Sequence, residues 1–298
     1  MAAVYTDTMK KRDSGVSLFL RAVYYYEGVA SATGGFMNNT DFATQQQPAY
    51  ETLRANMPGP GLSARYRFVS TREIIAELQR AGFAPAHYQE QRVTSAARRG
   101  FQKHIVRLRR SKEPVRVRDS VAEIIVINSH DGSAALSLSA GIFRLVCLNG
   151  LMASVATIPE IRIVHREYSV ARLQWGVERI AQQLPELEEK AEAWQTMAVP
   201  DAQMLEFAES AVALRWPEVE KRPQVHLEEL LIPKRDEDAL DSLWNVYNRL
   251  QERIIRGGFE ARFAGRKTMS LVRPVTGLDR TIELNRALWD TAMKFQQN

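Results

Sequence analysis

The chain has 298 residues, of which 45% are hydrophobic and 25% charged, and its formal net charge is +5. This length predicts one large or two modest domains with a substantial core. No apolar run approaches the roughly 20 residues that cross a bilayer, and the first residues lack the pattern of a signal peptide, so we expect a soluble, cytoplasmic protein without a membrane partner. The single cysteine, Cys147, excludes an internal disulfide and a multi-thiolate zinc site, and its apolar neighbours favour a buried structural thiol.

The charges are unevenly distributed along the chain. Residues 92–118 contain ten Lys or Arg and one acid, Glu113, which gives this segment a charge of +9. Residues 176–241 contain sixteen acids and seven basic residues, which gives −9. Such asymmetry indicates that one part of the molecule presents a surface to a polyanion.

The first half of the chain predicts an irregular arm followed by a basic α+β core. Residues 1–62 lack clear periodicity and end in the linker-like sequence TQQQPAYETLRANMPGPG. A helix is predicted from Ser70 to Gly82, because Ser70 and Glu73 match a capping box and Gly82 can end the helix. The elements expected after it are three strands at residues 85–93, 101–110 and 121–132, and a helix at residues 139–149.

The second half predicts mainly helices with acidic surfaces. A short strand is expected at residues 161–168, and apolar residues then recur at helical spacing over residues 177–197, 201–216, 236–258 and 281–295. Basic residues return in the tail at Arg262, Arg266, Lys267 and Arg273. The predicted fold class is therefore α+β, with a small antiparallel sheet packed by helices and followed by a mainly helical acidic region. The expected domains are residues 1–62, 63–175 and 176–298.

The strand at residues 101–110 carries the clearest functional signal. Lys103, Ile105, Arg107 and Arg109 alternate with apolar positions, so one face of this strand is predicted to be cationic while the other packs on a helix. Guanidinium groups bind phosphates, and an aromatic ring among them can stack on an exposed base. The residues expected to bind nucleic acid are Arg65, Tyr66, Arg67, Arg98, Arg99, Lys103, Arg107, Arg109 and Arg110, with Tyr66 as the stacking platform.

The sequence SHDG at residues 129–132 permits two interpretations. His130 and Asp131 could form the centre of a metal-dependent enzyme that acts on nucleic acid, or Asp131-Gly132 could be a turn that only shapes the backbone. Nucleotide-loop, HExxH and nucleophile-elbow patterns are absent from the sequence. The structural interpretation is therefore favoured, and we expect no catalytic residues, no metal and no cofactor.

Four sequence blocks resemble a known family. They are ARYRFVSTREIIAELQRAGF, INSHDGSAALSLSAGIFRLVCLNGLM, LWNVYNRLQERIIRGG and IELNRALW, which occur in this order from about Ser63 to the C-terminus. These blocks resemble the phage- and plasmid-encoded family of unknown function catalogued as domain family nine-three-two. The resemblance implies a mobile-element protein in a bacterial host cell, and it implies no catalytic residues.

A second similarity concerns architecture. The expected order of helix, three strands with a basic middle strand, and helix over Ser70 to Met152 is similar to the core of the Rad52-like single-strand annealing proteins, which bind single-stranded DNA as rings or filaments. This similarity implies a homo-oligomer that binds single-stranded DNA and promotes annealing or recombination, with a host or phage recombination factor as a further partner. Two alternatives stay open: the metal-dependent enzyme at His130 and Asp131, and an interaction protein that binds a host factor through its acidic helices.

Overall fold

The fold was analysed in a computed structural model, which describes residues 50–111, 116–117, 120–144 and 160–296. The predicted arm therefore lies outside the described residues except for its last part, and Cys147 also lies outside them. Helices and strands in this numbering are α2 (Glu51–Arg54), α3 (Thr71–Arg80), β1 (Phe83–Glu90), η2 (Ala96–Arg98), β2 (His104–Arg110), β3 (Arg116–Val117), β4 (Ser120–Asn128), β5 (Leu136–Arg144) and β6 (Ile161–Ile163). The later ones are η3 (His165–Glu167), α4 (Val170–Ala181), α5 (Leu184–Thr196), α6 (Asp201–Arg215), η4 (Val219–Lys221), β7 (Gln224–Val225), α7 (Leu227–Leu231), η5 (Asp236–Asp238), α8 (Leu243–Arg256), β8 (Glu260–Arg262), β9 (Ser270–Leu271) and α9 (Leu278–Phe295).

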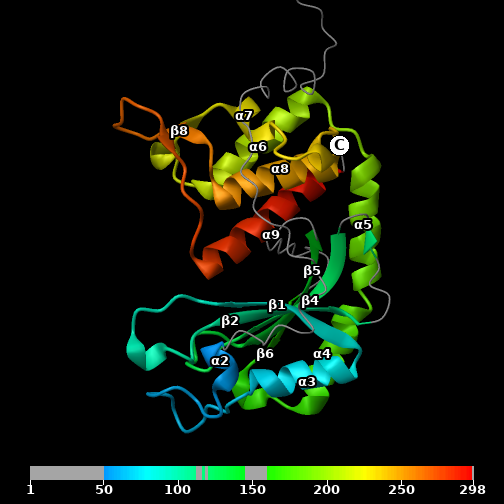
Figure 1. The fold of residues 1–298 in the computed structure, drawn as a ribbon, viewed down its shortest axis with the longest axis vertical. Coiled ribbons are helices and arrows are strands. Elements are labelled where there is room, and N and C mark those ends of the chain that lie inside the picture. The colour runs from blue at the N-terminus through cyan, green and yellow to red at the C-terminus, as the bar shows by residue number, and fades with distance from the viewer. Residues whose placement is uncertain (1–49, 112–115, 118–119, 145–159, 297–298) are drawn as a thin grey trace, which may run out of the picture.

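An antiparallel sheet forms the lower part of the molecule in Figure 1, which confirms the α+β class. Its strands follow the order β1-β2-β4-β5-β6, with β3 paired to β4. All nine residues of β4 are buried, because helices α3 and α4 cover one face of the sheet and α5 packs along β4 and β5. The apolar side chains of β2 at Val106 and Leu108 are also buried, as the alternating pattern predicts.

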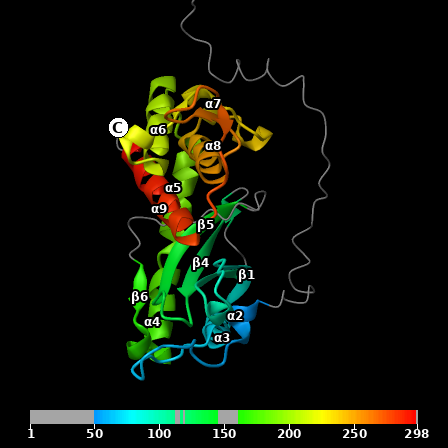
Figure 2. The same cartoon turned by 90° about the vertical axis from the view of Figure 1, so that its left-hand side faces the viewer.

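The helical part lies above the sheet in Figure 1, and in the perpendicular view of Figure 2 it meets the upper end of β5. Its core contains three aromatic residues from three helices: Trp194 of α5 lies with its ring centroid 4.3 Å from that of Trp289 in α9 and 5.9 Å from that of Tyr247 in α8. Because α5 contacts both this core and the sheet, it joins the two parts. The boundary predicted at residue 175 falls inside α4.

The predicted helix at residues 139–149 is wrong over its described part, where the chain forms strand β5. In β5, Leu136, Leu138, Ala140 and Ile142 alternate with small or polar residues, and β5 pairs with β4 from Ser120 to Ile127. A period of two together with the cross-strand partners on β4 outweighs the helix-forming residues in this segment. The fifth element of the predicted core is therefore a strand over its described part.

Several boundaries also differ from the sequence prediction. Ser70 lies at the N-terminus of α3, but its side chain makes no capping hydrogen bond, whereas Ser242 does cap α8 by accepting a hydrogen bond from the Asn245 amide. The helix predicted at 177–197 is two helices, since Pro185 starts α5. The strand predicted at 161–168 ends at Ile163. Within the described part of the chain, every helix is too short or too polar to cross a membrane.

The end of the predicted arm contributes to the core, contrary to expectation. Thr52 in α2 is buried, its amide donates a hydrogen bond of 2.9 Å to Glu90 Oε1, and its hydroxyl donates one of 2.6 Å to the same oxygen. The ring of Tyr50 lies 4.2 Å from that of Tyr88 in β1. These polar and aromatic contacts have no periodic sequence signal, and they fix α2 against the edge of the sheet.

Candidate nucleic-acid interface

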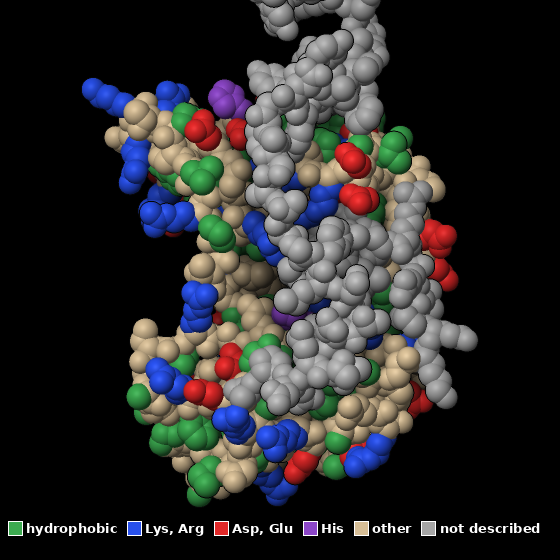
Figure 3. Space-filling view, viewed as in Figure 1, with side chains coloured by type: hydrophobic (Ala, Val, Ile, Leu, Met, Phe, Trp, Pro, Cys, Tyr) green, Lys and Arg blue, Asp and Glu red, His purple; other side chains and the backbone are tan. Residues whose placement is uncertain are grey.

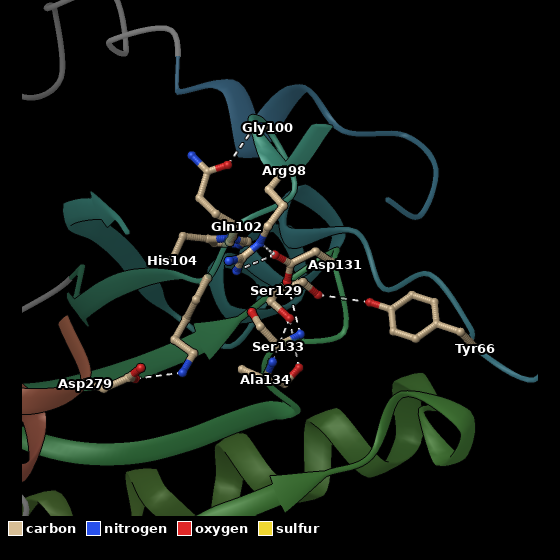
Figure 4. A network of polar contacts seen from close by, with 11 residues as sticks. Tyr66, Arg98, Gly100, Gln102, His104, Ser129, Asp131, Ser133, Ala134 and Asp279 are labelled. Atoms are coloured by element: carbon tan, nitrogen blue, oxygen red, sulfur yellow. Dashed lines mark hydrogen bonds and ion pairs between the residues drawn. The ribbon is translucent and has the colours of Figure 1, made fainter. Parts of the chain in front are cut away.

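Two distant segments reach the turn at residues 129–133 with their side chains (Figure 4). The hydroxyl of Tyr66 donates a hydrogen bond of 3.0 Å to the carbonyl oxygen of Ser129. From the other side, Arg98 Nε donates one of 2.9 Å to Asp131 Oδ2. The two basic stretches of the sequence, ARYR and AARR, are thereby brought to the same end of the sheet.

Main-chain hydrogen bonds fix this convergence. The amide of Gly59 donates to the carbonyl oxygen of His130 over 2.7 Å, and the amide of His130 donates to the carbonyl oxygen of Phe101 over 2.8 Å. Since backbone groups make these bonds, the arrangement does not depend on flexible side chains. The backbone of the turn is therefore tied to the segments at Gly59 and Phe101.

The turn itself has the structure that Asp131-Gly132 predicts. Asp131 Oδ1 accepts a hydrogen bond of 3.0 Å from the Ser133 amide, and Gly132 has a φ of +75°. Partial burial would raise the pKa of Asp131, but hydrogen bonds from Ser133 and Arg98 outweigh burial and lower the pKa. Asp131 is therefore a charged acceptor that stabilises the turn.

His130 points away from Asp131, which bears on the enzyme interpretation. The imidazole is buried, and its Nε2 lies 3.1 Å from the carbonyl oxygen of Thr52, whereas the Asp131 carboxylate faces Arg98 at the surface. The two side chains therefore do not point into a common site. Among the described residues, no three His, Cys, Asp or Glu side chains are grouped in a way that could hold a metal ion.

A buried network of histidines lies beneath the turn. The ring of His104 lies 5.0 Å from that of His130, and His104 Nε2 lies 2.7 Å from Thr71 Oγ1. His165 Nε2 lies 3.1 Å from Asn128 Oδ1. Burial lowers the pKa of His104 to about 4 and that of His130 to about 3, so both rings are neutral near pH 7.

The two segments that contact the turn carry four arginines, and we call them the arginine rim: Arg65, Arg67, Arg98 and Arg99. All four are exposed. Arg98 forms an ion pair with Asp131 at 2.8 Å, whereas the other three have no ion-pair partner among the residues that the structure describes. Arg65, Arg67 and Arg99 therefore carry positive charges that no carboxylate among the described residues neutralises.

Tyr66 differs from the exposed platform that the sequence suggests. Its side chain is half-buried, and its ring lies 4.8 Å from that of His165. Burial and the nearby carboxylate of Asp131 both raise the pKa of its hydroxyl. Tyr66 therefore stays neutral, and its hydroxyl donates a hydrogen bond to the carbonyl oxygen of Ser129. Tyr66 thus positions the segment that carries Arg65 and Arg67.

The expectation that β2 presents a free cationic face is wrong for Arg107 and Arg109. Both guanidinium groups form ion pairs with Glu123 of the neighbouring strand β4, at 3.0 Å and 2.7 Å. The Glu123 side chain is fully buried, and the Arg107 guanidinium also lies 3.8 Å from the ring centroid of Phe143. The Glu123 carboxylate thus holds both arginines at the sheet, and Phe143 also contacts Arg107.

The two remaining predicted residues face other elements. Lys103 Nζ forms an ion pair with Asp279 at the start of α9, at 2.7 Å, which links the sheet to the helical part. Arg110, at the far end of β2, donates a hydrogen bond of 3.3 Å to the carbonyl oxygen of Ala181 in α4. Of the predicted residues, Tyr66 and Arg98 therefore contact the turn directly, and Arg65, Arg67 and Arg99 are their neighbours in the chain.

Sequence reasoning missed Glu123. It is a single acid in the apolar run VAEIIVIN, and such a residue opposite two arginines of a neighbouring strand is the one signal that could have identified an internal ion pair. The sequence shows the basic residues of the tail. It does not show that the fold groups them with Arg215 and Trp216 near β8.

The comparisons with known proteins agree with the sequence blocks. The protein is 36% identical over 227 residues to "UPF0380 protein YafZ" of Escherichia coli strain K12, an alignment that covers 76% of this chain and 81% of the relative. It is also 36% identical over 228 residues to "UPF0380 protein YfjQ" of the same organism, with the same coverage. No solved structure matches the chain, and the similarity to Rad52-like proteins is not supported, since β5 replaces the helix on which it depended. The model of the family described as "Domain of unknown function (DUF932)" matches residues 61–289, and the chain therefore belongs to this family.

Proposed function

We propose that the protein binds single-stranded DNA through the arginine rim and, as a homo-oligomer, promotes annealing or recombination in a bacterial mobile-element setting. One observation carries this proposal: Arg65, Arg67 and Arg99 are exposed on the two segments that contact the turn, without an acidic partner among the described residues. Guanidinium groups held close together repel one another unless an anion lies between them. A phosphate backbone supplies such anions at regular spacing.

A single strand fits the arginine rim better than a duplex does. Planar guanidinium groups can stack on unpaired bases as well as bind phosphates, and the half-exposed ring of Tyr66 lies between Arg65 and Arg67 in the chain. No helix presents the rim residues in a way suited to a major groove, because Arg65 and Arg67 lie outside helices and Arg98 and Arg99 lie at the end of the one-turn η2.

A binding assay with matched variants tests this proposal. Fluorescence anisotropy of labelled single-stranded and duplex DNA is measured at low salt with the parent protein, with R65A/R67A/R99A, and with the control R80A/R179A/K294A. The control removes the same charge from three other exposed positions. The proposal predicts tighter binding of the single strand and weaker binding by the rim variant alone. Equal binding by both variants would reject the arginine rim as the site.

The annealing step has its own assay. Complementary strands, one carrying a fluorophore and the other a quencher, are mixed with and without the protein, and oligomer mass is measured by light scattering with and without DNA. The proposal predicts faster strand pairing and a mass above that of the monomer. A monomer that binds DNA but leaves the pairing rate unchanged would limit the function to strand binding.

A further inference from the structure

A cavity of about 610 Å³ lies in the helical part, between the end of α6 and the hairpin of β8 and β9. Its lining includes Arg215, Trp216, Phe263, Arg266 and Arg273, and the lining residues that the structure describes include no acid. Figure 3 shows Lys and Arg side chains gathered around this hairpin at the upper left of the view. The volume is that of a site for a small organic ligand, and we call this cavity the α6–β9 pocket.

Arg215 brings a half-buried positive charge to the pocket. Its guanidinium donates hydrogen bonds to the carbonyl oxygens of Ile254 and Arg273, and it has no ion-pair partner among the described residues. Burial and the neighbouring charge of Arg280 lower its pKa to about 10, so it remains protonated near pH 7. A half-buried cation next to a second cation is stabilised by any anion that enters the pocket.

Two aromatic rings form the apolar wall. The rings of Trp216 and Phe263 both line the pocket, with centroids 6.2 Å apart and an interplanar angle of 72°. The Arg215 guanidinium lies 4.7 Å from the Trp216 ring centroid, which holds the indole in place. A planar group that enters beside these rings meets the face of one and the edge of the other, which is the usual geometry of aromatic contacts.

The remaining wall is fixed to the core by its backbone. The Gly258 amide donates to the carbonyl oxygen of Val272 over 2.9 Å, and the Val272 amide donates to the carbonyl oxygen of Phe259 over the same distance. Arg273 follows Val272 directly and is exposed, and Arg266 is exposed at the tip of the hairpin. Two exposed arginines therefore line the pocket beside a wall that backbone hydrogen bonds fix.

We propose that the α6–β9 pocket binds a nucleoside phosphate, with the base against Trp216 and Phe263 and the phosphate on Arg266 and Arg273. The chemistry is selective in two ways, because the aromatic wall favours a planar ring system and the arginines favour a phosphate that can accept paired hydrogen bonds. The pocket lies on the helical part, away from the arginine rim on the sheet, so this proposal goes beyond the proposed function and stands independently of it.

Titration with defined probes tests the pocket. Adenosine 5′-monophosphate, adenosine and inorganic phosphate are titrated separately into the full chain, with tryptophan fluorescence and calorimetry as the two readouts. The nucleotide is expected to bind more tightly than either fragment and to quench fluorescence. R266A/R273A should weaken nucleotide binding roughly tenfold or more, the loss expected for one charge-assisted hydrogen bond, whereas R65A/R67A/R99A should bind it as the parent does.

W216F and competition with DNA complete the test. W216F keeps an aromatic ring and should bind the nucleotide while losing most of the quenching. Displacement of the nucleotide by a single-stranded oligonucleotide would identify the bound unit as part of a strand, and the absence of displacement would identify a free nucleotide. Both results support the pocket. Equal affinity for phosphate and nucleotide, or unchanged nucleotide binding by R266A/R273A, would overturn the proposal.

Discussion

The guanidinium of Arg107 lies 3.0 Å from the carboxylate of Glu123, inside a sheet face where the sequence pattern predicts contacts with phosphate. Burial lowers the pKa of Arg107, but the charge of Glu123 opposes that shift, so the ion pair retains the proton. The pair is thus an internal element of the fold. Its role can be separated from DNA binding, because the arginine rim does not include Arg107.

Replacement of Glu123 tests this internal role. E123Q leaves Arg107 and Arg109 without their buried counter-charge, and the expected loss in free energy of unfolding is about 3–5 kcal/mol. The control E218Q removes an exposed carboxylate that pairs with Lys221 and should cost less than about 1 kcal/mol. Urea unfolding measures both. A loss from E123Q no larger than that from E218Q would show that the ion pair does not stabilise the fold.

The sequence predicts elements well where the period is regular and poorly where tertiary contacts decide. Helix α6 and strands β2 and β4 follow their apolar patterns, and all of them are confirmed. Strand β5 differs from the predicted helix. Its alternation of leucine with serine favours a strand over a helix only when β4 supplies the hydrogen-bonding partner.

The candidate site shows the same division. Charge clustering identified the rim arginines, and the Asp-Gly pair identified the turn, since both are local properties of the sequence. The partner of Arg107 lies on another strand, and the α6–β9 pocket joins Arg215 to a hairpin far along the chain. Such long-range neighbours leave no local signal in one sequence.

The turn at residues 129–133 should tolerate loss of charge better than loss of its glycine. Gly132 has a φ of +75°, and an added Cβ would lie 2.8 Å from Leu62 Cδ2, so G132V is expected to cost about 1–3 kcal/mol. D131N keeps an oxygen that can accept the Ser133 hydrogen bond and should cost less than about 1 kcal/mol. Melting temperatures with DNA binding compare the two. Magnesium- or manganese-dependent DNA cleavage that D131N abolishes without loss of stability would favour the enzyme interpretation.

The buried histidines predict a loss of stability in mild acid. The unfolded chain protonates histidine below about pH 6.5, whereas the folded chain resists protonation of His104 until about pH 4. The contribution of the neutral histidines to the free energy of unfolding is therefore complete above pH 6.5. It falls as the pH decreases below that value, by about 1.4 kcal/mol per pH unit for each such histidine. Urea unfolding at several values between pH 7 and pH 5 measures this slope.

Two variants identify the groups responsible for the slope. H104Q and H130Q should each reduce it by the contribution of one histidine, because burial lowers the pKa of both rings. An identical slope for H104Q and the parent would assign the pH dependence to other groups.

The end of α8 contains a close backbone approach that glycine permits. Gly257 has a φ of +70°, and a Cβ there would overlap the carbonyl oxygen of Val272, whereas Gly265 has a φ of +76° with open space around it. G265A should cost about 1 kcal/mol through backbone strain alone. G257A should cost roughly 1–3 kcal/mol more, because the chain must also move. Equal melting temperatures for the two variants would contradict this packing.

The salt dependence of single-stranded DNA binding tests the central claim most directly. The affinity of the parent, of R65A/R67A/R99A and of the control R80A/R179A/K294A is measured by anisotropy over a series of salt concentrations. Each phosphate contact contributes about −0.7 to the slope of log affinity against log salt, so the loss of three contacts should reduce the magnitude of the slope by about 2. The account predicts this reduction for the rim variant and an unchanged slope for the control. Parental affinity and slope in the rim variant would contradict it.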